Sequence, residues 1–186
     1  MPENAIFSDF FLDLIAIKPK GAVSATSCEC VGSLEETIST KTITKKCRGR
    51  VKKSRTKGDA GTVKITMHMP YALYLSMYGM DDVPLAEGVH GYGPASTHPE
   101  CVVTARVKDE DDVIKYKAWP CATVTSDKAT KINDDDTEVA MVELELAVTP
   151  DDNELVAYEA LADDISEDLA TKWMVQWTPE LVAATS

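Results

Sequence analysis

Residues Thr62–Met69 read TVKITMHM, and this stretch decides the fold class. Every second side chain in it is apolar: Val63, Ile65, Met67 and Met69. The residues between them are polar, so the stretch has the period of two that is typical of a β-strand with one buried face. We therefore predict a strand here and a β-rich core against which it packs.

The residues that follow predict a short amphipathic helix over 70–78, the principal helix of the fold. Pro70 suits the first position of a helix, and Gly79 stands where a glycine often ends one. The apolar stripe has the spacing of one helical face and is expected to meet the core: Tyr71, Tyr74, Leu75 and Tyr78.

Before the strand, residues 34–58 predict a long hairpin that projects from the domain. Leu34–Thr44 (LEETISTKTIT) is rich in threonine and β-branched residues but poor in apolar ones, as in a strand exposed on both faces. Cys47–Lys57, with Gly49 and Gly58, would form the tip and the return strand.

Charge is unevenly distributed along the chain. Nine basic residues and no acidic one lie between positions 41 and 57: Lys41, Lys45, Lys46, Arg48, Arg50, Lys52, Lys53, Arg55 and Lys57. Of the 19 lysines and arginines this leaves ten elsewhere, against all 31 acidic residues, a balance of −21. The molecule therefore has a positive hairpin on a strongly negative body.

The rest of the chain predicts one mainly β domain over 1–186. Residues 80–99 are rich in proline and glycine and predict a long loop, and loops of that length usually have an interaction role. Further strands are expected at 10–17, 24–31, 100–108, 113–125, 139–149 and 153–161, with a short helix at 166–173. Seven or more strands with one flanking short helix make a β-sandwich or barrel.

The sequence carries no catalytic signature, so the chain is not expected to be an enzyme or to bind a cofactor or metal. The zinc-protease, nucleophile-elbow and phosphate-loop motifs are absent. His68, His90 and His98 stand in no motif, although a triad assembled only in space stays open. Asp134–Asp136 lacks the spacing of a calcium loop and predicts a solvated turn.

The five cysteines are interpreted as buried structural thiols, because none has the short paired spacing of a zinc or redox site: Cys28, Cys30, Cys47, Cys101 and Cys121. Cys28 and Cys30 are expected to point to one face of a strand. No apolar run reaches the roughly 20 residues that cross a bilayer, and no secretory signal is expected at Met1–Asp9. We expect a soluble protein made in the cytosol.

The basic run has two interpretations. Its cations could neutralise phosphates, but it contains no aromatic residue to stack on bases, and the rest of the chain would repel nucleic acid. Alternatively, the positive hairpin binds the negative body of a neighbouring copy, a heterologous contact that builds rings or stacks. The second interpretation is preferred.

The order of elements resembles the major tail protein, or tail tube protein, of long-tailed non-contractile bacteriophages. The likeness rests on the polar hairpin Leu34–Gly58, the strand GTVKITMHMP and the helix YALYLSMYG, and is clearest between Gly58 and Gly93. The resemblance implies a β-sandwich that forms hexameric rings, which stack into a tube in the virion tail. It also implies a hairpin that reaches a neighbouring subunit, an acidic lumen through which double-stranded DNA passes without specific binding, and partners such as the tape measure and terminator proteins.

On this reading Glu143 and Glu145 are the candidates for the lumen wall, because they lie on the polar face of a strong strand. The runner-up is an oligomeric virion decoration, connector or DNA-binding protein that uses the basic hairpin. A hydrolase using one of the three histidines is the third hypothesis.

Overall fold

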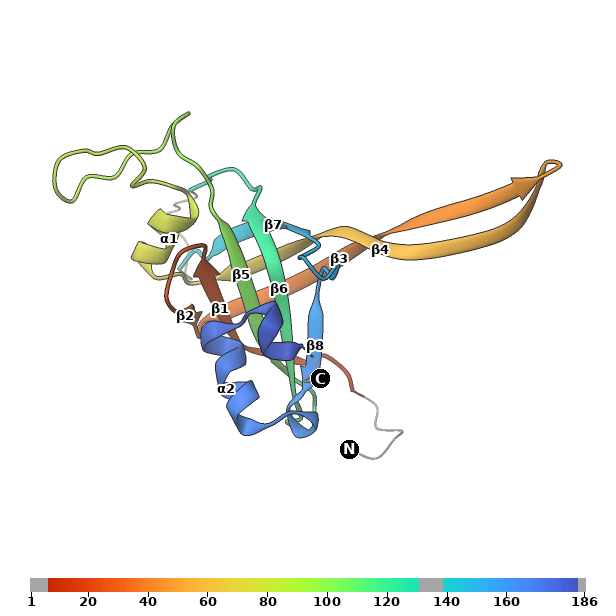
Figure 1. Cartoon of the computed structure of the whole chain (residues 1–186). Helices are drawn as coiled ribbons and strands as arrows, with labels where there is room; N and C mark the ends of the chain where they lie inside the picture. Colours follow the sequence, from red (N-terminus) through yellow and green to blue (C-terminus); the bar gives the residue numbers. More distant parts are fainter. Residues whose placement is uncertain (1–6, 131–138, 184–186) are drawn as a thin grey trace.

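The computed structural model describes residues 7–130 and 139–183, which form a single antiparallel sheet flanked by two helices (Figure 1). Seven strands follow the spatial order β2-β1-β5-β6-β7-β4-β3, and β8 pairs with part of β6. The strands are β1 (Phe11–Pro19), β2 (Thr26–Cys28), β3 (Val31–Cys47), β4 (Arg50–Met67), β5 (Glu100–Lys108), β6 (Ile114–Val124), β7 (Val142–Thr149) and β8 (Tyr158–Leu161). The helices are α1 (Tyr71–Met77) and α2 (Glu167–Gln176), with 3-10 turns at Ala162–Asp164 and Pro179–Val182.

The mainly β prediction is confirmed. The sheet curls so far that β1 and β3, which are well separated in the strand order, are in contact. β6 makes this possible by changing partners along its length: its first half pairs with β8 and its second half with β7. Pro120 lies between the two halves, where the β5 register shifts and the ladder needs no donor from it.

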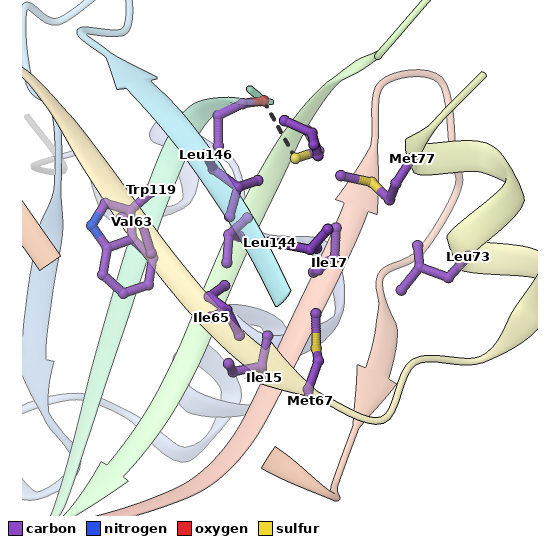
Figure 2. Close-up of a cluster of buried hydrophobic side chains, with 14 of the residues drawn as sticks. Ile15, Ile17, Val63, Ile65, Met67, Leu73, Met77, Trp119, Leu144 and Leu146 are labelled. Carbon is purple, nitrogen blue, oxygen red and sulfur yellow. Dashed lines mark hydrogen bonds between the residues drawn. The ribbon is translucent and has the colours of Figure 1, made fainter. Parts of the chain in front are cut away.

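The larger core lies on one face of the curled sheet, where α1 covers it (Figure 2). The alternation predicted for TVKITMHM is seen here, because Val63, Ile65 and Met67 are fully buried. They lie beside Leu144 and Leu146 of β7, with which β4 is in register. Burial of this apolar surface is the main source of stability.

A second core lies on the opposite face, under α2. Alternation along β1 divides its side chains between the two cores: Ile15 and Ile17 belong to the first and Ala16 to the second. Trp173 and Trp177 fill the second core. The hydroxyl of Ser166 caps α2 by accepting the backbone N–H of Leu169 at 3.2 Å.

The helix predictions need two corrections. The principal helix is α2, with ten residues, rather than α1, with seven. Three residues of the predicted stripe meet the core as expected, since Leu75 and Tyr78 are buried and Tyr74 packs against them. Tyr71, the first residue of α1, does not, and is 65% exposed. Gly79 follows α1 as predicted, with a φ of 57°, in the left-handed region that glycine tolerates.

The strand predictions hold in position but not always in extent. Residues 62–67 are the end of one 18-residue strand, β4, and His68 and Met69 follow it. The same strand contains the predicted hairpin return, so Gly58 is inside a strand and not in a turn. β8 occupies only the last four residues of the strand expected at 153–161. The Asp134–Asp136 turn lies outside the described residues. None of the described helices is long and apolar enough to cross a membrane.

Candidate assembly surface

The hairpin of β3 and β4 projects far beyond the body of the molecule (Figure 1). The strands pair from Val31↔Met67 to Cys47↔Arg50, and the turn residues Arg48 and Gly49 have φ values of 50° and 75°. Every residue from Ser39 to Asp59 is exposed, and we call this segment the arm. At about 3.3 Å per residue, the arm reaches roughly 30 Å past Ile38, the last partly buried residue of β3.

The register divides the arm into two chemically different faces. Residues directly opposite each other in an antiparallel pair point to the same face. The pairs Lys41↔Lys57, Ile43↔Arg55 and Lys45↔Lys53 therefore share one face, which we call the cationic face. It carries five of the nine cations around one isoleucine.

The opposite face of the arm carries hydroxyl groups. It is formed by the pairs Thr42↔Thr56 and Thr44↔Ser54, and the Thr42 and Thr56 hydroxyl oxygens are 2.9 Å apart. The sequence placed all nine cations in the hairpin, but it did not show that five of them share one face. Which face each β4 side chain occupies relative to β3 depends on two register shifts. These lie between Ile38 and Thr40 and between Lys45 and Lys46.

The arm gains little from its own side chains. Two of its three cross-strand pairs on the cationic face place lysine opposite lysine, which is destabilising in a hairpin. None of the nine cations makes an ion pair with any residue that the structure describes. An acidic partner would relieve this repulsion.

The root of the arm is fixed to the body by a buried polar network. Glu36 of β3 accepts hydrogen bonds from Lys117 Nζ (2.8 Å) and from the Trp119 indole N–H (2.7 Å), both on β6. Lys117 is also 2.9 Å from Glu159 of β8. Burial lowers the pKa of Lys117, but the hydrogen bonds that it donates to Glu36 and Glu159, with the charges of these carboxylates, outweigh burial, so the pKa is raised overall.

Glu143 and Glu145 lie on the outer face of β7, away from the larger core. Glu145 is opposite Lys64 of β4 and forms an ion pair with it at 3.4 Å. Glu143 is opposite Thr66 and exposed. Lys64 is also opposite Glu35 of β3, the strand that pairs with the other edge of β4. This outer face therefore holds three carboxylates, those of Glu35, Glu143 and Glu145, and one lysine.

The segment between α1 and β5, residues 78–99, contains the long loop predicted at 80–99, and it is held in a defined shape. Asp82 accepts the backbone N–H of Thr97 at 2.6 Å. His98 donates from Nδ1 to the Val124 carbonyl at 2.9 Å, and its Nε2 lies 3.2 Å from the Tyr92 hydroxyl. Despite this order the loop leaves four apolar residues 42–55% exposed: Val83, Leu85, Val89 and Tyr92.

The histidines do not come together as a catalytic group would. His90 pairs with Asp81 and His98 binds the sheet, both within the loop, while His68 follows β4 with its backbone N–H bonded to Cys30. The described residues contain no group of three His, Cys, Asp or Glu side chains that could hold a metal ion.

The cysteine prediction is only partly right. Cys28 and Cys101 are buried, but Cys30 and Cys47 are exposed. Cys30 is exposed because β2 ends at Cys28, so the alternation that would have placed both thiols on one face does not continue. Cys47 is exposed because it lies at the tip of the arm, away from the body.

No protein-family model matches the sequence, and no curated protein matches it. Among solved structures, the chain is similar to a chain of the anti-feeding prophage cap (AFP tube terminating cap), with a TM-score of 0.47 and 9% identity over 87% of this chain and 99% of that one. It is also similar to a chain of the anti-feeding prophage baseplate, with a TM-score of 0.42 and 12% identity over 86% of this chain and 97% of that one. Because both TM-scores are below 0.5, these similarities do not identify the function of this chain.

Proposed function

We propose that this chain is a non-catalytic structural subunit that assembles with copies of itself into the tube of a phage tail. The observation that carries the proposal is the arm. It extends roughly 30 Å, buries none of its residues on its own body and places like charges opposite each other. Such a segment stabilises nothing in the monomer, so its role is contact with another molecule.

The partner that the charges favour is a second copy. The chain outside residues 41–57 has a balance of −21, so every neighbouring body offers the arm a strongly negative surface. A contact between an arm and a body is heterologous, and repeated heterologous contacts give rings or stacked filaments. The resemblance of the sequence to tail tube proteins extends the proposal to hexameric rings, to a virion location and to the tape measure and terminator as neighbours.

In such a tube the outer face of β7 would line the lumen. Glu35, Glu143 and Glu145 outnumber Lys64 there, so the wall would repel phosphate and let DNA pass without binding. The pairing of Glu145 with Lys64 leaves Glu143 as the stronger contributor.

The test removes the arm and leaves the body. Residues 41–57 are replaced by Asn-Gly, a two-residue turn that suits a hairpin. The armless variant should unfold like the wild type and remain a small species in sedimentation, while the wild type forms rings or tubes in negative-stain microscopy. Rings or tubes formed by the armless variant would falsify the proposal.

The nine cations of the arm, which form no ion pair with any described residue, also favour a second candidate, a protein that binds duplex DNA through the arm. That function requires an affinity for DNA that falls steeply as salt is raised and is lost in the armless variant. If the wild type binds DNA in this way and does not self-associate, the DNA-binding candidate is the correct one.

A further inference from the structure

We propose that the cationic face of one copy binds the α1–β5 loop, residues 78–99, of the next copy. This inference rests on the proposed function and names the surface of the neighbour that the arm contacts. The two surfaces differ in sequence, position and chemistry, so the contact is head-to-tail.

The two surfaces lie at opposite ends of the molecule. β4 links them directly, because it begins at Arg50 beside the tip of the arm and ends at Met67, four residues before α1 begins at Tyr71. Its 18 residues span about 60 Å. Figure 1 shows the arm on one side of the sheet and the loop on the other. Surfaces placed in this way cannot meet within one molecule, but they can join one copy to the next without limit.

The charges of the two surfaces are complementary. Asp81, Asp82 and Glu87 are exposed on the loop, which contains no lysine or arginine of its own. The nearest cation from another segment is Lys128, which lies over the rings of Tyr74 and Tyr92. The cationic face presents five cations and no carboxylate. Opposite charges across an interface guide encounter and fix orientation.

The apolar residues are complementary as well. Ile43 lies at the middle of the cationic face and is 58% exposed. The loop offers Leu85 and Val89, which flank Glu87 and are both more than half exposed. A small apolar centre within a charged rim is the usual anatomy of a protein interface, and it is not what a DNA phosphate surface requires.

The loop is also prepared for binding. The hydrogen bonds from the Thr97 backbone N–H to Asp82 and from His98 to the Val124 carbonyl fix its shape before any partner arrives. A preordered loop loses less conformational entropy on binding than a flexible one. These anchors are separate from Leu85, Glu87 and Val89, which can therefore be changed without releasing the loop.

Two complementary defective proteins test the contact. The acceptor is the armless variant, which keeps the loop. The donor keeps the arm and carries Leu85→Ser, Glu87→Lys and Val89→Ser. Each should sediment as a monomer alone, and an equimolar mixture should give a 1:1 heterodimer that grows no further.

Matched charge reversals then locate the face within the arm. Introducing Lys41→Glu, Lys45→Glu and Arg55→Glu into the donor should weaken the heterodimer by about a hundredfold or more. Reversing Arg48, Arg50 and Lys52 near the tip changes the net charge equally and should weaken it by less than about tenfold. Equal losses from both sets would overturn the assignment of the face.

The remaining outcomes separate this inference from the proposed function. A donor that still polymerises alone overturns the loop as the partner surface but leaves arm-dependent assembly intact. If the wild type assembles but the donor and acceptor do not pair, the loop is likewise overturned as the partner surface and arm-dependent assembly stands. An armless protein that polymerises defeats the proposed function itself, and an arm that binds duplex DNA while the mixture stays unpaired overturns the choice of a second copy.

Discussion

Glu36 Oε2 lies 2.8 Å from Lys117 Nζ, and this ion pair joins the root of the arm to the centre of the sheet. Oε1 of the same carboxylate accepts the Trp119 indole N–H at 2.7 Å. A lever roughly 30 Å long amplifies any rotation at its base, so the direction of the arm depends on how firmly this root is held. The network therefore connects body stability to the geometry of assembly.

Removing the Glu36 carboxylate should be costly. Glu36→Ala leaves the Trp119 indole and part of the Lys117 ammonium without partners, and we expect a loss of about 2–4 kcal/mol in the free energy of unfolding. Glu35→Ala is the matched control, because the neighbouring side chain lies on the exposed outer face, and it should cost less than about 0.5 kcal/mol. Denaturant unfolding measures both, and equal costs would contradict the network.

Lys45→Glu should separate the stability of the arm from its function. It turns the Lys45↔Lys53 pair into an attractive one, which should stabilise the arm by about 0.2–1 kcal/mol. Slower hydrogen exchange of the arm amides would report this. The same change removes a positive charge from the cationic face, so self-association should weaken.

The control for that prediction is Thr44→Glu, which adds the same acidic group to the hydroxyl face. It should weaken self-association less than Lys45→Glu does. A Lys45→Glu protein that assembles as well as the wild type would show that the cationic face is not a contact surface.

The sequence predicted what depends on local periodicity. The alternation in TVKITMHM gave the buried set Val63, Ile65 and Met67, and the polar run before it gave a projecting hairpin. The role of Glu36 could not be predicted from the sequence. Glu35 and Glu36 are adjacent residues of the same type, and they differ only in the face of β3 that each occupies. Glu36 is favourable on the inner face only because Lys117, 81 residues away, lies within hydrogen-bond distance.

The wrong predictions for Cys30 and Tyr71 have the same cause, which is that local sequence does not show contacts between distant segments. Burial of Cys30 required β2 to continue past Cys28, and whether a short edge strand continues depends on its partner β1. The stripe in α1 held for Tyr74, Leu75 and Tyr78, and it failed only at Tyr71, the first residue of the helix. In both cases the deciding information lies in contacts between distant segments.

The two C-terminal tryptophans should respond differently to the same substitution. Trp173 donates its indole N–H to the Lys117 carbonyl at 3.1 Å, whereas the indole nitrogen of Trp177 is buried with no hydrogen-bond partner among the described residues. Both are 2% exposed, so replacement by phenylalanine removes similar apolar contacts. Trp173→Phe should cost about 1–2 kcal/mol more in unfolding free energy than Trp177→Phe, and the reverse order would contradict this hydrogen-bond assignment.

The buried thiol of Cys101 predicts a loss of stability in alkali. Burial, with a smaller contribution from the nearby Glu100 charge, raises its pKa from 9.0 to about 12. Between these values the unfolded chain releases the thiol proton while the folded protein keeps it. The contribution is therefore fully present below pH 9.0 and is lost as the pH rises through about 12.

Cys101→Ser isolates this effect, because the hydroxyl can replace the thiol as a donor to the Ala122 carbonyl, which is 3.3 Å from the sulfur. The free energy of unfolding should fall by about 1 kcal/mol more in the wild type than in this variant between neutral pH and about pH 10. The raised pKa of Lys117 does not affect this difference, because it is present in both proteins and changes stability only above pH 10.5. Cys30→Ser, at an exposed thiol, serves as the control and should retain the wild-type decline. Parallel pH profiles for wild type and Cys101→Ser would mean that the thiol ionises without unfolding the surrounding core.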